Sequence, residues 1–205
     1  MKNIFLSLVA VFCVVIAQAQ TNVDQSNSSG FGAKGGINIA NFVGDDAGSS
    51  KSFVGFNFGL FAEFKLSQKL YIQPELLYSA QGAKEDLTIE GIDFDATLKV
   101  NYINIPVMFK YYVANDFSLE AGPYVGFLTS AKVKVESSIG SGTEDAKDFF
   151  KSTDFGLGIG FNYDVTQAIF LNARYSAGLA QIGDTDTDDN DVKNSVLQFG
   201  LGFRF

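Results

Sequence analysis

Eight long segments of this sequence alternate between apolar and other residues, and this alternation restricts the fold more than any other feature. In Phe53 to Leu66 every even position from Val54 onward is apolar, whereas the odd positions include Asn57, Glu63 and Lys65. A period of two residues is typical of a β-strand with one apolar face. Each segment also meets or exceeds the about 9 to 11 residues that a tilted strand needs to cross a hydrocarbon core. The segments are Phe31 to Phe42, Phe53 to Leu66, Leu70 to Ala83, Thr97 to Val113, Phe117 to Val135, Asp154 to Val165, Ala168 to Ile182 and Asn194 to Phe205.

The connections between these segments are short and long in turn. Three are tight turns around Gln68, Asn115 and Gln167. The other four are longer and polar, and they cover residues 44–52, 84–95, 136–151 and 183–193. An up-and-down antiparallel sheet places alternate connections at opposite ends. The sequence therefore predicts one end with short turns and one end with four long loops, as in outer-membrane barrels.

The tight turns predict which residues lie opposite each other. Around Asn115, Tyr111 is opposite Leu119 on the apolar face, and Lys110 is opposite Glu120 on the polar face. The other two turns give the apolar pairs Phe64 with Ile72 and Tyr163 with Leu171, and the polar-face pairs Glu63 with Gln73 and Gly160 with Arg174. All three hairpins agree on which face is apolar.

The second face of the strands decides between two kinds of barrel. It mixes glycines with charged residues, whereas a soluble surface favours lysine and glutamate over rows of glycine. Inside a narrow eight-stranded barrel, long charged side chains need partners, and glycines opposite them leave room. We therefore expect an all-β, eight-stranded, antiparallel, up-and-down transmembrane barrel rather than a soluble sandwich or lipocalin-like barrel. The expected interior polar network consists of Lys34, Glu63, Glu75, Lys110, Glu120, Arg174 and Arg204.

Three prolines oppose this interpretation. Pro74, Pro106 and Pro123 all fall within expected strands, where each removes a backbone donor from the ladder. We expect β-bulges to absorb them.

The composition argues against most enzymes and against nucleic acid. The chain has no histidine, so it lacks the usual general base and the usual partner of a nucleophilic serine or cysteine. Its net charge of −8 provides no basic surface for phosphates of nucleic acid. The inward carboxylates, such as Glu63 and Glu75, are interpreted as ion-pair partners rather than as catalytic groups. We expect no catalytic residue and no cofactor.

One acidic segment near the C-terminus is a weak candidate for a metal site. Asp184, Asp186 and Asp188 have the spacing of the first three ligands in a calcium loop. However, Asp189 stands where the turn glycine of such a loop is needed. We favour a solvated acidic loop over weak binding of Ca²⁺ or Mg²⁺.

The N-terminus has the features of a secretory signal. Lys2 precedes the apolar run from Ile4 to Ile16, and Ala17-Gln18-Ala19 is a cleavage site of the small-x-small type. The run is short for a membrane anchor, which is the alternative. We expect residues 1–19 to be a signal peptide, 20–30 a flexible lead and 31–205 the barrel domain.

Several short motifs, in their order and spacing, resemble the PorT-like outer-membrane β-barrel domain family of Gram-negative bacteria. The motifs are Gly35-Gly36-Ile37-Asn38, Gln73-Pro74-Glu75-Leu76-Leu77-Tyr78, Tyr102-Ile103-Asn104-Ile105-Pro106, Ala173-Arg174-Tyr175 and Gly200-Leu201-Gly202-Phe203-Arg204-Phe205. The resemblance implies a barrel in the cell outer membrane with its short turns and both termini in the periplasm. It also implies that Phe205 is the assembly signal presented to the barrel assembly machinery.

The expected function is that of an integral outer-membrane protein with a structural or binding role. The expected partners are outer-membrane lipid, including lipopolysaccharide, and the barrel is expected to be a monomer. Two alternatives remain open at this point, a narrow channel for small solutes and a soluble periplasmic barrel that binds lipid.

Overall fold

The structure, a computed structural model, describes residues 30–45, 47, 50–89, 92–137, 140–183 and 191–205. The expected signal peptide, nearly all of the lead, and Asp184, Asp186 and Asp188 lie outside these described residues. The strands are β1 (Gly30–Val43), β2 (Lys51–Lys65), β3 (Leu70–Ile89), β4 (Ile92–Tyr112), β5 (Phe117–Ser137), β6 (Gly140–Asp145), β7 (Thr153–Asp164), β8 (Ile169–Gly178) and β9 (Lys193–Arg204). A short 3-10 helix, η1 (Lys147–Phe149), follows β6. Within the described ranges no helix has the length and apolar character to cross a membrane.

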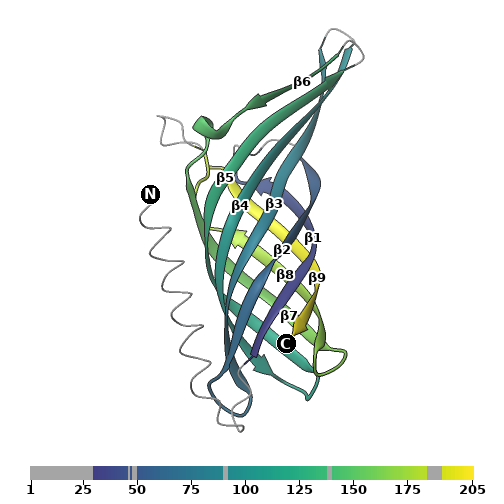
Figure 1. Ribbon diagram of the computed structural model, residues 1–205. Coiled ribbons are helices and arrows are strands. Elements are labelled where there is room, and N and C mark those ends of the chain that lie inside the picture. The colour runs from purple at the N-terminus through teal and green to yellow at the C-terminus, as the bar shows by residue number, and fades with distance from the viewer. Residues whose placement is uncertain (1–29, 46, 48–49, 90–91, 138–139, 184–190) are drawn as a thin grey trace.

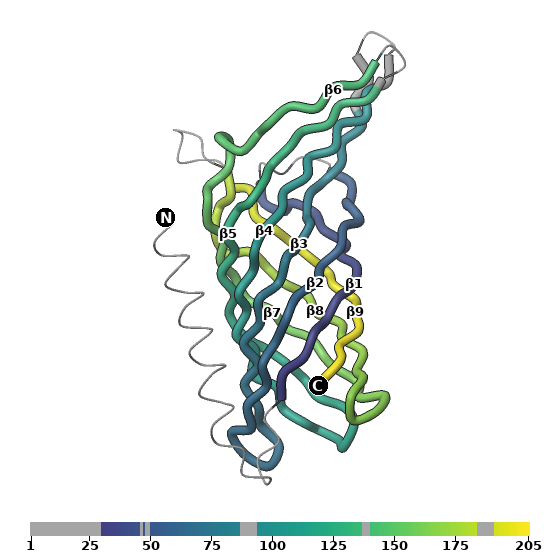
Figure 2. Tube along the Cα trace, in the orientation of Figure 1, coloured from purple at the N-terminus to yellow at the C-terminus, as the bar shows by residue number. Residues whose placement is uncertain are grey.

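Eight of the strands form a closed antiparallel ring. Each pairs with its neighbour along the chain, β5 pairs directly with β7, and β9 pairs back with β1 (Figures 1 and 2). Closure leaves no free sheet edge around the ring, which is the condition for a sheet that crosses lipid. The strand β6 lies outside the ring and pairs with the upper end of β5.

The apolar face of the ring points outward, as the sequence predicts. Phe58, Leu157 and Leu201 expose 56%, 54% and 56% of their surface, whereas Glu75 and Arg174 are almost completely buried. This orientation excludes a soluble barrel with an apolar interior, because water would meet a continuous hydrophobic surface around the ring.

The register of the hairpins confirms the predicted pairs. Tyr111 lies opposite Leu119 and Lys110 opposite Glu120 across the β4–β5 turn. The pairs Phe64 with Ile72, Tyr163 with Leu171 and Gly160 with Arg174 are also present. Each tight turn is closed by a backbone bond, for example from Val113 N–H to Phe117 C=O at 3.0 Å.

The expectation of loops over 84–95 and 136–151 was wrong in part. The strands β3 and β4 continue as a long hairpin beyond the ring, with Asp86 opposite Asp95, and β6 occupies part of the third connection. These extensions lie outside the barrel, so neither face is fully covered, and their charged side chains hide the period of two. The seventh segment is shorter than expected, because β8 ends at Gly178 and not at Ile182.

The expected bulges at the prolines are absent from the described strands. The pairs Pro74 with Val107 and Leu77 with Asn104 have the same register, so the ladder loses bonds there without a shift. The two register shifts of the ring lie elsewhere, in β2 between Ser52 and Asn57 and next to Asn101 in the β4–β5 ladder.

The interior changes character along the barrel axis. Charged residues fill the half nearer the short turns, and amides follow in the middle, where Asn57 donates to Asn38 at 2.6 Å. Toward the long connections the interior contains an apolar cluster, beside which the polar residues Gln81, Asp154 and Asn194 are also buried. The buried members of this apolar cluster are Phe42, Ala83, Val100, Tyr102, Leu128, Ala131, Ala146 and Ile182.

Candidate functional site in the barrel interior

Arg174 is the centre of the interior network. From β8 its two terminal nitrogens donate to the carboxylate of Glu75 on β3 at 2.9 and 2.7 Å. Its Nε donates to Glu120 on β5 at 2.6 Å. The planar guanidinium matches two carboxylates at once, which a lysine ammonium cannot do with the same geometry. One side chain thus connects three strands across the lumen.

Both carboxylates have further donors. Glu75 also accepts from Lys34 Nζ at 3.2 Å and from Gln73 Nε2 at 2.6 Å. Glu120 accepts from Asn162 at 2.9 Å and Asn172 at 3.1 Å. Removing charges from water is expensive, and full hydrogen bonding of each charge offsets that cost.

Glycines provide the space for this cluster. A Cβ placed on Gly160 would lie 3.1 Å from Glu120 Oε1 and 2.4 Å from the carbonyl oxygen of Ala173. A Cβ on Gly158 would lie 3.5 Å from Arg174 Cδ. Gly160 therefore leaves room for the cluster, whereas a Cβ on Gly158 would make an ordinary contact with Arg174.

A second ionic group lies closer to the short turns. Lys110 Nζ is 2.5 Å from Glu63 Oε2. Arg204 is 2.9 Å from Asp164 and 3.5 Å from the other oxygen of Glu63. Lys110 thus pairs with Glu63 although Glu120 lies directly opposite it in register, because Arg174 and two asparagines already occupy that carboxylate.

Two inward aromatic rings pack together beside the second ionic group. Phe61 and Phe170 meet edge to face with centroids 5.6 Å apart. The Lys110 ammonium and the Arg204 guanidinium lie 5.1 and 4.6 Å from the centroid of the Phe170 ring, within range of a cation–π contact. The ring covers Gly202, where a Cβ would lie 2.0 Å from it.

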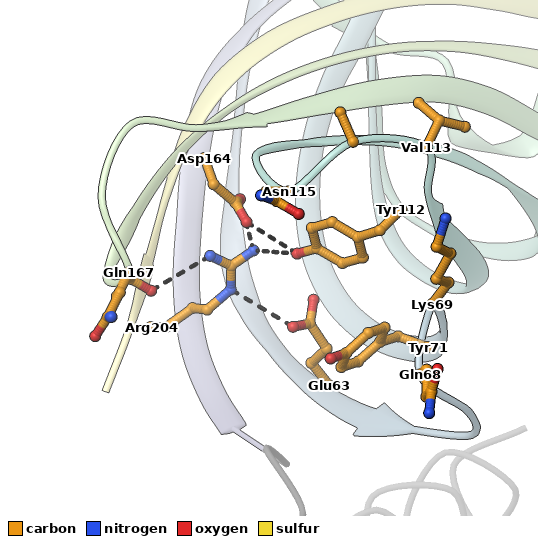
Figure 3. A pocket seen from close by; sticks show the side chains of 11 residues that line it. Glu63, Gln68, Lys69, Tyr71, Tyr112, Val113, Asn115, Asp164, Gln167 and Arg204 are labelled. Carbon is orange, nitrogen blue, oxygen red and sulfur yellow. Dashed lines mark hydrogen bonds and ion pairs between the residues drawn. The ribbon is translucent and has the colours of Figure 1, made fainter.

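A cavity of about 740 Å³ opens at the end of the barrel with the short turns. Gln68, Asn115 and Gln167, one from each tight turn, contribute to its lining. Figure 3 shows the guanidinium of Arg204 between Asp164, Glu63 and the phenol of Tyr112. Deeper in the barrel, a second cavity lies beside Arg174. Its volume is about 10 Å³, which is about the minimum that holds one water molecule.

The structure places all seven predicted network residues on the inward face and joins them into two ionic groups. Sequence analysis missed Asp164, Tyr112, Phe61 and Phe170. The signal for Asp164 was present, because it has the same strand parity as Asn162, and Phe170 likewise shares its parity with Asn172. Phe61 also shares its parity with Glu63, but the expected interior network was limited to charged residues.

The arrangement favours structure over catalysis. Each of the carboxylates Glu63, Glu75, Glu120 and Asp164 has a cationic partner. In the part of the chain that the structure describes, no group of three or more acidic, histidine or cysteine side chains has the geometry to hold a metal ion.

The chain belongs to the family of the outer membrane protein beta-barrel domain, whose model matches residues 17–184. This membership places the protein in the cell outer membrane, in agreement with the closed ring and its apolar outer face. No curated protein matches the chain.

The chain is also similar in fold to solved structures, among them that of the Yersinia pestis outer membrane protein Ail. The crystal structure of Ail, the attachment invasion locus protein of Yersinia pestis, is 16% identical with a TM-score of 0.50, and the match covers 85% of this chain and 97% of that one. Neisserial surface protein A is 15% identical with a TM-score of 0.48, and the match covers 87% and 99% of the two chains. At these identities the likeness to Ail concerns the fold alone.

Proposed function

We propose that this protein is a sealed outer-membrane barrel with a structural or binding role, and that it is neither a channel nor an enzyme. The filled lumen carries the proposal. Arg174, Glu75 and Glu120 bridge strands on opposite sides of the ring, and the space beside them is about 10 Å³. The apolar cluster behind them forms a second obstruction toward the long connections.

We further propose that the chain falls within the PorT-like branch of these barrels. The motif Gln73-Pro74-Glu75 supports this, because Glu75 is the carboxylate that Arg174 of the motif Ala173-Arg174-Tyr175 binds. Two motifs about one hundred residues apart thus form one ion pair.

The partners we propose are the lipids that surround the ring, including lipopolysaccharide, and the barrel assembly machinery during biogenesis. Phe205 supports the second partner, since its side chain is 76% exposed at the end of β9. A monomer is sufficient for this role, because the ring closes within one chain.

Conductance across planar lipid bilayers tests the sealed lumen. Purified protein is first checked for a folded barrel by its gel mobility in cold detergent before and after boiling. The folded protein is expected to add almost no current to the bilayer. A steady ionic conductance from folded protein would support the small-solute channel instead and reject this proposal.

A further inference from the structure

A group of lysines lies on the outward face of β3, β4 and β5, where these strands begin to extend beyond the ring. Figure 1 shows β3, β4 and β5 continuing side by side past the other strands. Lys99 on β4 lies directly opposite Lys132 on β5. In the next row, Lys84 and Lys134 lie on either side of Thr97. Residues directly opposite in a sheet share a face, so these four side chains form one lysine patch, Lys84, Lys99, Lys132 and Lys134.

Within the described part of the chain, three of the four lysines have no ion-pair partner in contact, although Asp145 on β6 lies directly opposite Lys132. Lys134 is 2.9 Å from Glu136. Among the side chains that the structure describes, no carboxylate lies within 4.0 Å of the ammonium groups of Lys84, Lys99 or Lys132. Like charges directly opposite each other destabilise a sheet unless something neutralises them.

Within β3, β4 and β5 the charges on this face are sorted by sign. The flanking strands differ, because Lys51 of β2, opposite Lys84, pairs with Asp86, and Asp145 of β6 lies opposite Lys132. The row beyond the lysines holds Asp86, Asp95 and Glu136, which lie opposite one another. Opposite charges directly across from each other stabilise a pair of strands, so a surface that serves only solubility would be more stable with its charges mixed. Here the positive rows are nearer the ring and the negative row is farther away.

The patch begins where the apolar outer surface ends. Phe56, Phe58 and Tyr78 form an outward aromatic cluster with ring centroids 5.5 to 6.2 Å apart, and aromatic residues mark the membrane interface of barrels. Tyr78 is opposite Ile103, and Lys99 precedes Ile103 by four positions, about 13 Å along the strand toward the long connections. Lysine side chains can extend back toward the interface over such a surface.

We propose that the lysine patch binds the phosphate groups of an anionic glycolipid in the outer leaflet. The inference rests on the proposed contact with outer-membrane lipid and assigns it to four residues. Compact ammonium groups on neighbouring strands converge on one phosphate as point charges, and Thr97 places a hydroxyl between them. Binding removes the repulsion between Lys99 and Lys132, and the acidic row beyond the patch limits the site on its far side.

The test compares two double variants of the full-length mature barrel in neutral detergent. Lys99→Gln with Lys132→Gln removes two charges from the patch. The matched control, Lys151→Gln with Lys193→Gln, removes two charges at the same end of the barrel but outside the patch. Native mass spectrometry counts bound diphosphorylated lipid A, with dephosphorylated lipid A and inorganic phosphate as further probes.

We expect diphosphorylated lipid A to bind the wild-type barrel at least tenfold more tightly than the Lys99/Lys132 variant, and the control within twofold of the wild type. Equal binding of dephosphorylated lipid A, or an equal loss in the control, would overturn the proposal. Displacement by inorganic phosphate at equal concentration would overturn the assignment to a lipid. Each variant is first checked for the heat-dependent gel shift, so that failure of the barrel is distinguished from failure of the site.

Discussion

At the scale of single residues, Arg174 provides the positive charge that stabilises the buried carboxylates of the interior. It donates three hydrogen bonds to Glu75 and Glu120, and both carboxylates are completely or almost completely removed from solvent. Replacing it with glutamine leaves two buried carboxylates with the single cation Lys34 nearby. We expect Arg174→Gln to lower the free energy of unfolding by about 3–5 kcal/mol, because a buried charge loses its partner. Urea titration of the barrel in lipid vesicles, followed by gel mobility, measures this.

A compensating variant separates charge from packing. With Glu75→Gln and Glu120→Gln added, Arg174→Gln leaves no unpaired charge, and most of the lost stability is expected to return. Arg204→Gln makes the same chemical change at the mouth of the barrel, where the side chain is 14% exposed, and is expected to cost less. Equal losses in the single and triple variants would show that shape, rather than charge, is what Arg174 contributes.

At the scale of secondary-structure elements, the long β3–β4 hairpin has two parts with different roles. Up to Lys84, β3 pairs with β2 and belongs to the ring; beyond Lys84 it pairs with β4 alone. We expect replacement of residues 86–95 by Asn-Gly, a two-residue hairpin turn between the partners Glu85 and Ala96, to leave the barrel folded. The free energy of unfolding is expected to change by less than about 1 kcal/mol, since the ion pair removed, Lys51 with Asp86, is exposed.

The matched control shortens the same hairpin within the ring. Deletion of Ser79-Ala80 together with their partners Asn101-Tyr102 keeps the register between β3 and β4 but shifts each strand against its other neighbour, β2 or β5. It also removes the hydroxyl that Asn38 binds and a buried tyrosine. This control is expected to lose the heat-dependent gel shift, whereas the tip variant keeps it. A tip variant that fails to fold would mean that the extension helps to form the barrel.

The same hairpin shows what the sequence can and cannot predict. Inside the ring one face meets lipid and the other meets the lumen, so the alternation was clear and the strands, turns and hairpin registers followed from it. Beyond the ring, Lys84, Glu85 and Asp86 are all exposed, and consecutive charged residues resemble a loop. The ion-pair partners could not be predicted from the sequence either. Lys110 binds Glu63 because a side chain from β8 already occupies Glu120. Partner choice across a lumen depends on positions that one strand does not encode.

At the scale of the whole molecule, the outward apolar surface defines the environment of the protein. Ile159 lies in the middle of β7 with 64% of its surface exposed, and Phe149 in η1 is 65% exposed outside the ring. In lipid vesicles Ile159→Lys places a charge in the hydrocarbon, and we expect it to reduce the free energy of unfolding by about 2–4 kcal/mol. Phe149→Lys, with the same exposure and the same added charge, is expected to change it by less than about 0.5 kcal/mol, as is usual for surface positions. Urea titration of both variants in vesicles measures the difference. Similar values for the two would mean that Ile159 faces water, which contradicts a membrane-spanning ring.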